Sequence, residues 1–326
     1  VRAFVPEGGR VLDPFTGVGT IPFEACLQGK QTFGFEISPA ALAISIAKVS
    51  RPETAEVRRI LGSLKDYLET KVVTEQEIES AKQINFNRSL DEFYHESTFR
   101  EILLARRFFS RPTSCSIETN FVFACLIHIL HGNRPYALSR RSHPITPFAP
   151  RGPREYRSLI QRLEAKAERS LNVEYPPEFR EGHIYIQDAT AWWPREVDGL
   201  DAVVTSPPFF DSTRFYLANW IRLWFCGWER CDFETQPLRF LDLKQKQSMR
   251  SYEPVFRQAR ERLKSNGLLV LHLGKSVKCN MAEELSQIAK PWFRVIDVFE
   301  ESVSHCESHG ITDKGKVSTH QYLILG

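Results

Sequence analysis

Two short apolar runs near the N-terminus, each followed directly by a segment with helical spacing, constrain the fold of this chain most strongly. RVLDPF (10–15) leads through the turn TGVGT (16–20) into IPFEACLQGK (21–30). QTFGFEIS (31–38) leads in the same way into PAALAISIAKVS (39–50). Short buried strands that alternate with helices are typical of a parallel sheet with right-handed crossovers. The N-terminus therefore predicts the first half of an α/β domain.

The same alternation resumes near residue 183. HIYIQDAT (183–190), DAVVTS (201–206) and LLVLHLG (268–274) predict three more strands, and a helix is expected over 248–267. FRVIDVFEESV and HQYLILG, at the end of the sequence, predict two strands that pair antiparallel. The predicted fold class is therefore α/β, a seven-stranded Rossmann-like sheet with helices on both faces and a large, mostly helical insertion.

The change in pattern between these two parts predicts three regions: 1–50, an insertion over 51–180, and 181–326. Within the insertion, residues 53–110 are mostly helical and amphipathic, and 155–171 form a further helix. The length of 326 residues suits one large domain with such an insertion, or two domains.

Composition excludes several classes of protein. No run approaches the roughly 18 apolar residues of a membrane span, and no signal peptide is visible. The seven cysteines show no paired spacing, so we interpret them as reduced thiols of a cytoplasmic protein. His305, Cys306 and His309 form the one candidate metal cluster, and we interpret them as part of a polar loop with no metal.

The glycine-rich turn after the first strand is a candidate ligand-binding loop. Gly17 and Gly19 precede a helix, where small residues let a ligand approach backbone N–H groups. Glu36 ends the second strand. Its distance in sequence from the glycines is about that at which an acidic residue hydrogen-bonds to ribose hydroxyls. A tight turn with a surface acid is the alternative. A dinucleotide fingerprint is disfavoured, because its third glycine is absent: Pro22 stands at that position and the bulky Phe23 follows.

A second candidate site is the segment Ser206-Pro207-Pro208-Phe209, which directly follows the apolar run LDAVV. The prolines end a strand because they have no N–H for the sheet ladder. They also fix a hydroxyl, carbonyls and an aromatic ring side by side. Two acceptors aimed at the N–H groups of an exocyclic amine would favour a tetrahedral nitrogen with its lone pair free to react. A rigid loop that merely ends a strand is the alternative.

Together, DPFTGVGT (13–20) and SPPF (206–209) resemble the two motifs of S-adenosylmethionine-dependent amino-methyltransferases, D-P-F-x-G-x-G-T and [D/N/S]-P-P-[Y/F]. The resemblance covers about 1–50 and 183–326. It implies a methyltransferase sheet and S-adenosylmethionine as cofactor. It also implies these cofactor-binding residues: Asp13, Phe15, Gly17, Gly19 and Thr20 around the methionine part, Glu36 at the ribose, Ile37 beside the adenine and Asp188 at the adenine amino group.

The same resemblance implies the catalytic roles. Ser206 Oγ and the Pro207 carbonyl would accept from the target amine, Pro208 would hold the loop, and Phe209 would stack on the base. Family members with Ser before the prolines are typically cytosine-N4 enzymes, and those with Asp mostly modify adenine-N6. The expected substrate is therefore DNA with a flipped cytosine. A companion restriction endonuclease is a candidate partner, and the oligomeric state stays open.

An excess of arginine marks the insertion between residues 134 and 157. Arginine binds phosphates and pairs bidentately with guanine, so this stretch is a candidate DNA reader, with a solvated basic loop as the alternative. The aromatic segment 212–228 is a second candidate DNA surface, although its helical spacing favours core packing. The candidate DNA-binding residues are Arg134, Arg140, Arg141, His143, Arg151 and Arg154.

Three other functions compete with this interpretation. An RNA amino-methyltransferase similar to the tRNA guanine-N2 enzymes would share both motif types, but those enzymes normally carry Asp before the prolines and an added RNA-binding domain. A non-catalytic binding module would be expected to lose Ser206, Pro207 or Gly17, and all three are present. An NAD-dependent dehydrogenase is disfavoured by Phe23 and by the Pro-Pro loop.

Overall fold

The chain divides into two compact units. The computed structural model describes residues 1–326 apart from 87, 111–115, 133–134, 142–148, 211–214 and 304–316. The sheet unit comprises Val1–Val49, Tyr175–Arg214 and Pro237–Gly326, and the helical unit comprises Ser50–Glu174 and Phe215–Gln236. The sequence-based division has nearly the same boundaries at 50 and 180, but it left 215–236 in the C-terminal region, whereas the structure groups this segment with the insertion.

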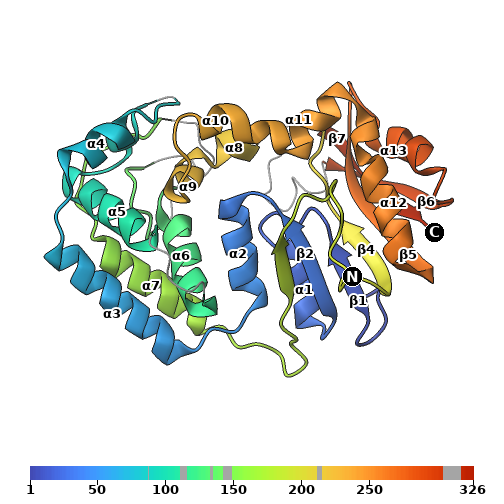
Figure 1. Ribbon diagram of the computed structural model, residues 1–326, viewed down its shortest axis with the longest axis horizontal. Helices are drawn as coiled ribbons and strands as arrows, with labels where there is room; N and C mark the ends of the chain where they lie inside the picture. The colour runs from blue at the N-terminus through green and yellow to red at the C-terminus, as the bar shows by residue number, and fades with distance from the viewer. Residues whose placement is uncertain (87, 111–115, 133–134, 142–148, 211–214, 304–316) are drawn as a thin grey trace. The chain divides into compact units, whose positions relative to one another are not determined.

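The sheet unit contains one seven-stranded sheet in the order β3-β2-β1-β4-β5-β7-β6 (Figure 1). Strands β3, β2, β1, β4 and β5 pair parallel, and β7 runs antiparallel to both β5 and β6. The predicted α/β class, the seven strands and the antiparallel pair at the end are confirmed. The strands are β1 (Arg10–Asp13), β2 (Gln31–Glu36), β3 (His183–Ile186), β4 (Leu200–Thr205), β5 (Leu263–Ser276), β6 (Val295–Ser302) and β7 (Val317–Leu325).

Alternate residues of the central strands pack against helices on opposite faces of this sheet. Val11 and Ala202 pack with Ala25 of α1, whereas the next residues, Leu12 and Val203, pack into the core on the other face with α12 and α13. Successive side chains of a strand point to opposite faces, so the apolar runs are continuous because both faces are buried. The helices of this unit are α1 (Thr20–Leu27), α2 (Pro39–Val49), α11 (Leu241–Gln247), the 3₁₀ turn η3 (Met249–Tyr252), α12 (Glu253–Arg262) and α13 (Met281–Ala289).

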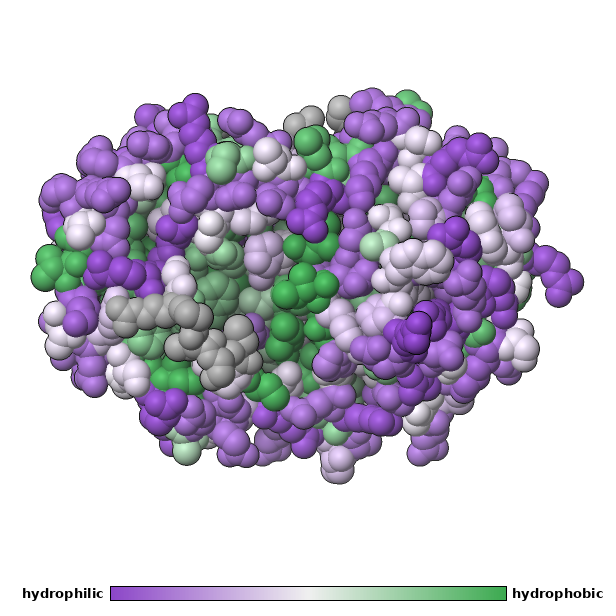
Figure 2. All heavy atoms as spheres, in the orientation of Figure 1, coloured by the Kyte–Doolittle hydropathy of each residue, from purple (hydrophilic) through white to green (hydrophobic). Residues whose placement is uncertain are grey.

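Helices α12 and α13 are amphipathic. Their buried residues include Val255, Phe256 and Leu285, while Arg257 and Glu284 stay on the solvent side. Figure 2 shows mostly hydrophilic side chains over the part of the view where these two helices lie. One face of each helix therefore covers the sheet and the other is hydrated.

Two predicted helix ends are wrong. The helix expected over 248–267 ends at Arg262, because Leu263 adopts an extended backbone and pairs with Leu200 of β4. The helix expected from residue 155 begins at Leu159, where the Ser158 side chain accepts a hydrogen bond from the Gln161 N–H.

The helical unit consists mostly of amphipathic helices packed around the largely buried helices α6 and α9. Its members are α3 (Thr54–Thr70), α4 (Glu75–Lys82), η1 (Leu90–Phe93), α5 (Glu96–Phe109), α6 (Ile117–Ile129), α7 (Leu159–Leu171), α8 (Phe215–Ala218), α9 (Trp220–Phe225) and α10 (Asp232–Thr235). The 3₁₀ turn η2 (Gln236–Arg239) begins at the last residue of this unit and continues into the sheet unit. Trp220 and Trp224 of α9 are fully buried, and the Trp220 ring meets that of Phe93 edge-on at 5.4 Å. The helical spacing of α9 therefore reflects core packing, whereas the residues of α8 are only partly buried, so a DNA surface over 212–228 stays a prediction.

Among the described residues, no helix is long and apolar enough to cross a membrane. The described part of the chain also holds no group of three or more metal-ligating side chains. His305, Cys306 and His309 lie outside the described residues. Cys26, Cys125, Cys226, Cys231 and Cys279 are free thiols.

A candidate active site at the carboxyl ends of β1 and β4

The two sequence motifs meet where β1 and β4 end side by side. These strands pair parallel, with Val11 opposite Ala202 and Leu12 opposite Val203, so both carboxyl ends lie at the same edge of the sheet. A buried hydrogen bond of 2.5 Å joins the motifs, from the hydroxyl of Thr205 to Oδ1 of Asp13. In open α/β sheets this edge, where the strand order reverses between neighbouring strands, is where ligands bind.

Asp13 holds this junction together. Asp13 is 2% exposed, and its Oδ1 also accepts the Phe15 N–H at 3.0 Å. Burial raises the pKa of Asp13 to about 7, although the hydrogen bonds from Thr205 and Phe15 act in the opposite direction. Asp13 therefore fixes the turn that follows β1 and ties that turn to β4.

The two glycines of the turn have different surroundings. Gly19 has φ +78°, and a Cβ placed there would lie 2.8 Å from Cβ and 2.9 Å from Cα of Ser45 in α2. Gly17 has φ +52°, and a Cβ placed there would meet nothing within 4 Å. Gly19 thus allows α1 and α2 to pack closely, whereas Gly17 leaves open space beside the turn. Thr20 is exposed at the first residue of α1.

Glu36 faces the same turn from the end of β2. Its Oε1 accepts the Ser38 N–H at 2.6 Å, and the N–H groups of Ile37 and Gly17 also hydrogen-bond to its carboxylate. Burial raises the pKa of Glu36 to about 7; these backbone hydrogen bonds lower it and the nearby Asp13 raises it further. Two carboxyl groups that ionise near neutral pH therefore flank the turn.

Asp188 follows β3 and binds a lysine. Its Oδ2 accepts from Nζ of Lys244 at 2.9 Å, and its Oδ1 accepts both the N–H and the hydroxyl of Thr190. Burial opposes ionisation of Asp188, but the hydrogen bonds from Thr190 and Lys244 outweigh it and hold its pKa below the usual value. Asp188 is therefore an ionised acceptor that orders the start of the segment after β3.

The Ser-Pro-Pro-Phe loop is held by buried side chains of α11 and η3. Nε2 of Gln245 donates to the Pro208 carbonyl at 3.0 Å, and Oε1 of Gln245 accepts from the Tyr252 hydroxyl at 2.9 Å. The Tyr252 ring meets the Phe15 ring edge-on at 6.2 Å. A chain of contacts thus runs from the Pro-Pro loop back to Phe15, directly before the glycine turn.

Ser206 and Phe209 lie against two histidines of neighbouring strands. Ser206 Oγ lies 3.1 Å from Nδ1 of His272 in β5, and Nε2 of His272 lies 3.0 Å from Nδ1 of His320 in β7. The Phe209 ring meets both imidazoles edge-on, at 5.3 and 5.7 Å. Only glycine fits at position 274, because a Cβ there would lie 2.9 Å from the Phe209 ring. The Ser-Pro-Pro-Phe loop is therefore backed by a histidine pair.

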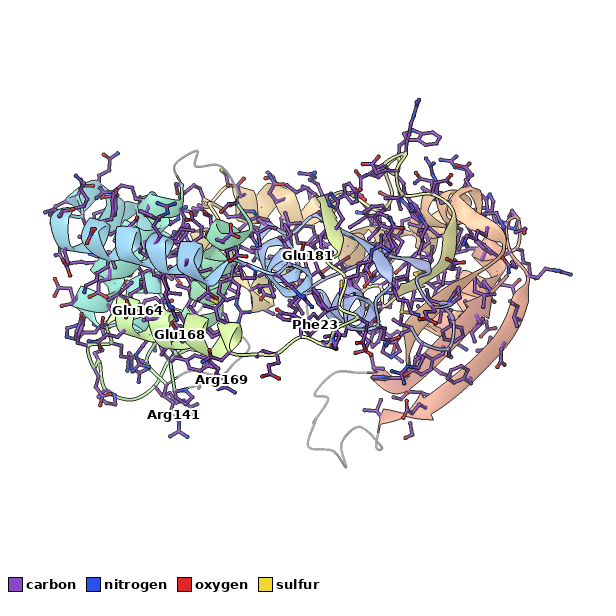
Figure 3. All side chains as sticks on the ribbon, turned by 90° about the horizontal axis from the view of Figure 1, so that it is seen from below. Phe23, Arg141, Glu164, Glu168, Arg169 and Glu181 are labelled. Carbon is purple, nitrogen blue, oxygen red and sulfur yellow. The ribbon has the colours of Figure 1, made fainter. Side chains whose placement is uncertain are left out.

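The predicted DNA-binding residues belong to the helical unit. Arg140 donates to the carbonyls of Gly152 and Glu92, so its guanidinium holds two segments of this unit together. Arg141, Arg151 and Arg154 are exposed, and Figure 3 shows the Arg141 side chain extending away from the helices. Arg134 and His143 lie outside the described residues.

The sequence analysis missed the residues that support the site. Two of them carried a signal, because His272 and His320 are polar residues inside the apolar strand patterns LLVLHLG and HQYLILG. Thr205 and Gly274 lie in predicted strands but carried no signal of their own, and the remaining three lie on short polar segments. The missed residues are Thr205, Lys244, Gln245, Tyr252, His272, Gly274 and His320.

A scan of the chain against protein-family models finds no match, and a search of curated protein sequences also finds none. The solved structures that resemble it include a TehB-like SAM-dependent methyltransferase from Corynebacterium glutamicum, at 10% identity and TM-score 0.35, which covers 98% of this chain and 82% of that chain. A SAM-dependent methyltransferase from Methanosarcina mazei is 8% identical, with TM-score 0.38 and coverage of 99% and 94%. The glycopeptide N-methyltransferase MtfA, complexed with sinefungin, is 9% identical, with TM-score 0.35 and coverage of 98% and 80%. At this level of identity and overlap, the likeness assigns no activity to this chain.

Proposed function

We propose that the protein transfers a methyl group from S-adenosylmethionine to an exocyclic amino group of a flipped base in DNA, with cytosine-N4 favoured over adenine-N6. The observation that carries the proposal is the junction of the two motifs. Thr205, the residue before Ser206, is hydrogen-bonded to Asp13, the first residue of DPFTGVGT. A methyl donor at the glycine turn would therefore lie beside the Ser-Pro-Pro-Phe loop.

The residues around the turn suit S-adenosylmethionine. Gly17 leaves open space in front of the turn, and the partly exposed Glu36 carboxylate can accept from the two ribose hydroxyls once it is ionised. The bound cofactor would supply an electrophilic methyl group on a sulfonium. The carboxyl groups of Asp13 and Glu36 give this edge of the sheet acidic character, which favours a cationic donor.

The Ser-Pro-Pro-Phe loop would contribute to the reaction by positioning the target amine. Ser206 Oγ and the Pro207 carbonyl would accept from the two N–H groups of the amine, which turns its lone pair toward the methyl group. The Gln245 bond to Pro208 keeps the loop in place, so little reorganisation is needed during the reaction. Phe209, whose ring packs steeply inclined against those of His272 and His320, would present a face to the base.

The direct test is methyl transfer from labelled S-adenosylmethionine to duplex DNA, with structured RNA of equal length assayed in parallel. Label in DNA supports the proposal. Label in RNA alone would favour the tRNA-type alternative, and no label in either would refute the enzymatic activity.

Cofactor affinity should depend on pH through Glu36. Its pKa is raised to about 7, so below pH 7 the carboxyl is mostly protonated and must lose a proton before it can accept from both ribose hydroxyls. The affinity for S-adenosylhomocysteine should therefore fall as the pH drops from 8 to 5, by up to about tenfold per unit below 7. Calorimetry across this pH range measures the effect.

Glu36→Gln is the matched control for that titration. It keeps the shape and one acceptor but has no proton to lose, so its affinity should be weaker at pH 8 and nearly independent of pH. A steep pH dependence that survives in Glu36→Gln would assign the titration to another group, of which Asp13 is the nearest.

The exposed arginines of the helical unit should bind DNA phosphates. Replacing Arg141, Arg151 and Arg154 with Ala should weaken DNA binding and lower the salt slope by about 0.9 for each phosphate that these arginines neutralise in the wild type. Fluorescence anisotropy at several salt concentrations gives both quantities. Arg140→Ala is the contrast, because Arg140 bonds to backbone carbonyls and its loss should lower stability first. An unchanged salt slope in the triple variant would place the DNA-binding surface elsewhere.

A further inference from the structure

The strongest unexplained feature of the sheet unit is the hydrogen-bonded series Ser206–His272–His320. It spans three segments that are far apart in the sequence, with distances of 3.1 and 3.0 Å. His272 and His320 stand on the antiparallel strands β5 and β7, where Gly274 is the register partner of His320 and Tyr322 that of His272. The pair is therefore placed by the sheet, not by a loop.

The surroundings of the pair restrict how the rings can turn. The His272 ring stacks on Tyr322 at 4.9 Å and 22°, and Tyr322 stacks in turn on Phe299 at 4.7 Å and 15°. The Phe209 ring also packs against both imidazoles. Because the rings are packed in this way, each nitrogen of His272 stays directed at one partner.

We propose that His272 and His320 are positioning residues that fix the proton of Ser206 and carry away the proton released by methyl transfer. This inference rests on the function proposed above. In the required tautomer, His272 Nδ1 accepts from the Ser206 hydroxyl and its Nε2–H donates to Nδ1 of His320. The lone pairs of Ser206 Oγ then remain for the N–H group of the target amine.

The reaction balances without any further reagent. The bond from the methyl carbon to sulfur breaks with its electron pair left on sulfur, and the amine lone pair forms the new carbon–nitrogen bond. The nitrogen, now cationic, gives a proton to Ser206 Oγ as the serine proton passes to Nδ1 of His272. His272 passes its Nε2 proton to His320, and the partly exposed His320 releases its own Nε2 proton to water.

The charged and titratable groups around His272 keep it in the form that accepts a proton. Burial lowers the pKa of His272 to about 4, with His320 lowering it further and Glu301 of β6 raising it. Glu301 also lies 3.4 Å from the Tyr322 hydroxyl. His272 is thus neutral at pH 7. A weak base is sufficient here, because a methylated aryl amine that still carries its extra proton is a strong acid.

The test is a single-turnover assay with labelled S-adenosylmethionine and a DNA oligonucleotide. His272→Ala should slow methyl transfer about 100-fold and leave S-adenosylhomocysteine affinity unchanged. Added imidazole should restore part of the rate, because it fits the vacated space and accepts a proton from Ser206. The rescue should grow with the fraction of neutral imidazole as the pH rises.

His183→Ala is the matched control, since His183 is an exposed histidine of β3, at one edge of the same sheet. It should keep the wild-type rate and show no response to imidazole. A wild-type protein that transfers no methyl group would refute the proposed function itself. If the wild type is active, a His272→Ala rate equal to it overturns this inference alone. The inference is also overturned if His272→Ala is slow and imidazole does not restore its rate, whether or not its cofactor affinity falls.

Discussion

Gly19→Ala is expected to lower the free energy of unfolding by about 3 kcal/mol. Part of the loss, about 1 kcal/mol, comes from placing a Cβ at φ +78°. The rest comes from overpacking, since that Cβ would lie 2.8 Å from Cβ and 2.9 Å from Cα of Ser45, and a backbone atom cannot turn aside. Urea unfolding followed by circular dichroism measures the change.

Gly17→Ala is the control for this prediction. Its φ of +52° carries a similar conformational penalty, but a Cβ there meets nothing within 4 Å, so the loss should stay near 1 kcal/mol. Its side chain would enter the space assigned to the cofactor, and S-adenosylhomocysteine binding should weaken although the protein is folded. Equal losses of stability in the two variants would contradict the close packing of α1 on α2.

The parts of the fold that could be predicted are the elements with a local pattern of apolar residues. The apolar runs around Leu12 and Val203 predicted buried parallel strands, and their period of two explains why neighbouring residues pack into separate cores. The end of α12 was missed because Leu263 leaves the helix to pair with Leu200, a long-range contact that no local signal records.

The candidate site likewise contains residues that could be predicted from local sequence and residues that could not. Each motif could be found because its residues are consecutive, and the parallel order of β1 and β4 then places both at one edge of the sheet. Their supports carried little signal, apart from the polar His272 and His320 in apolar strands, because each support is one side chain placed by sheet register or by α11 and η3. Thr205 meets Asp13 across 192 positions, and His272 meets Ser206 across 66. Such pairs follow from the fold and are invisible in the spacing of residues.

Ser206→Ala should slow methyl transfer on the order of 100-fold, the usual effect of losing one hydrogen bond that acts in the transition state. Cofactor affinity should hold, since Asp13 is bonded by Thr205 and not by Ser206. Ser265→Ala, at an exposed serine of β5, is the matched control and should keep the wild-type rate. Equal rates in the two variants would remove Ser206 from the reaction. Ser206→Asp keeps an acceptor and imitates the adenine-type motif, so it should retain more activity than Ser206→Ala.

The modified base found by mass spectrometry of digested product DNA tests the mechanism separately from the rate. N4-methylcytosine is the expected product, because a hydroxyl and a proline carbonyl can together accept from the two N–H groups of an exocyclic amine. N6-methyladenine would leave this mechanism intact and change only the base, since adenine presents the same kind of amino group. 5-Methylcytosine would refute the mechanism, because methylation of a ring carbon needs a cysteine nucleophile and Ser206-Pro207-Pro208-Phe209 contains none. The product therefore decides between nitrogen and carbon chemistry even if every variant of Ser206 is inactive.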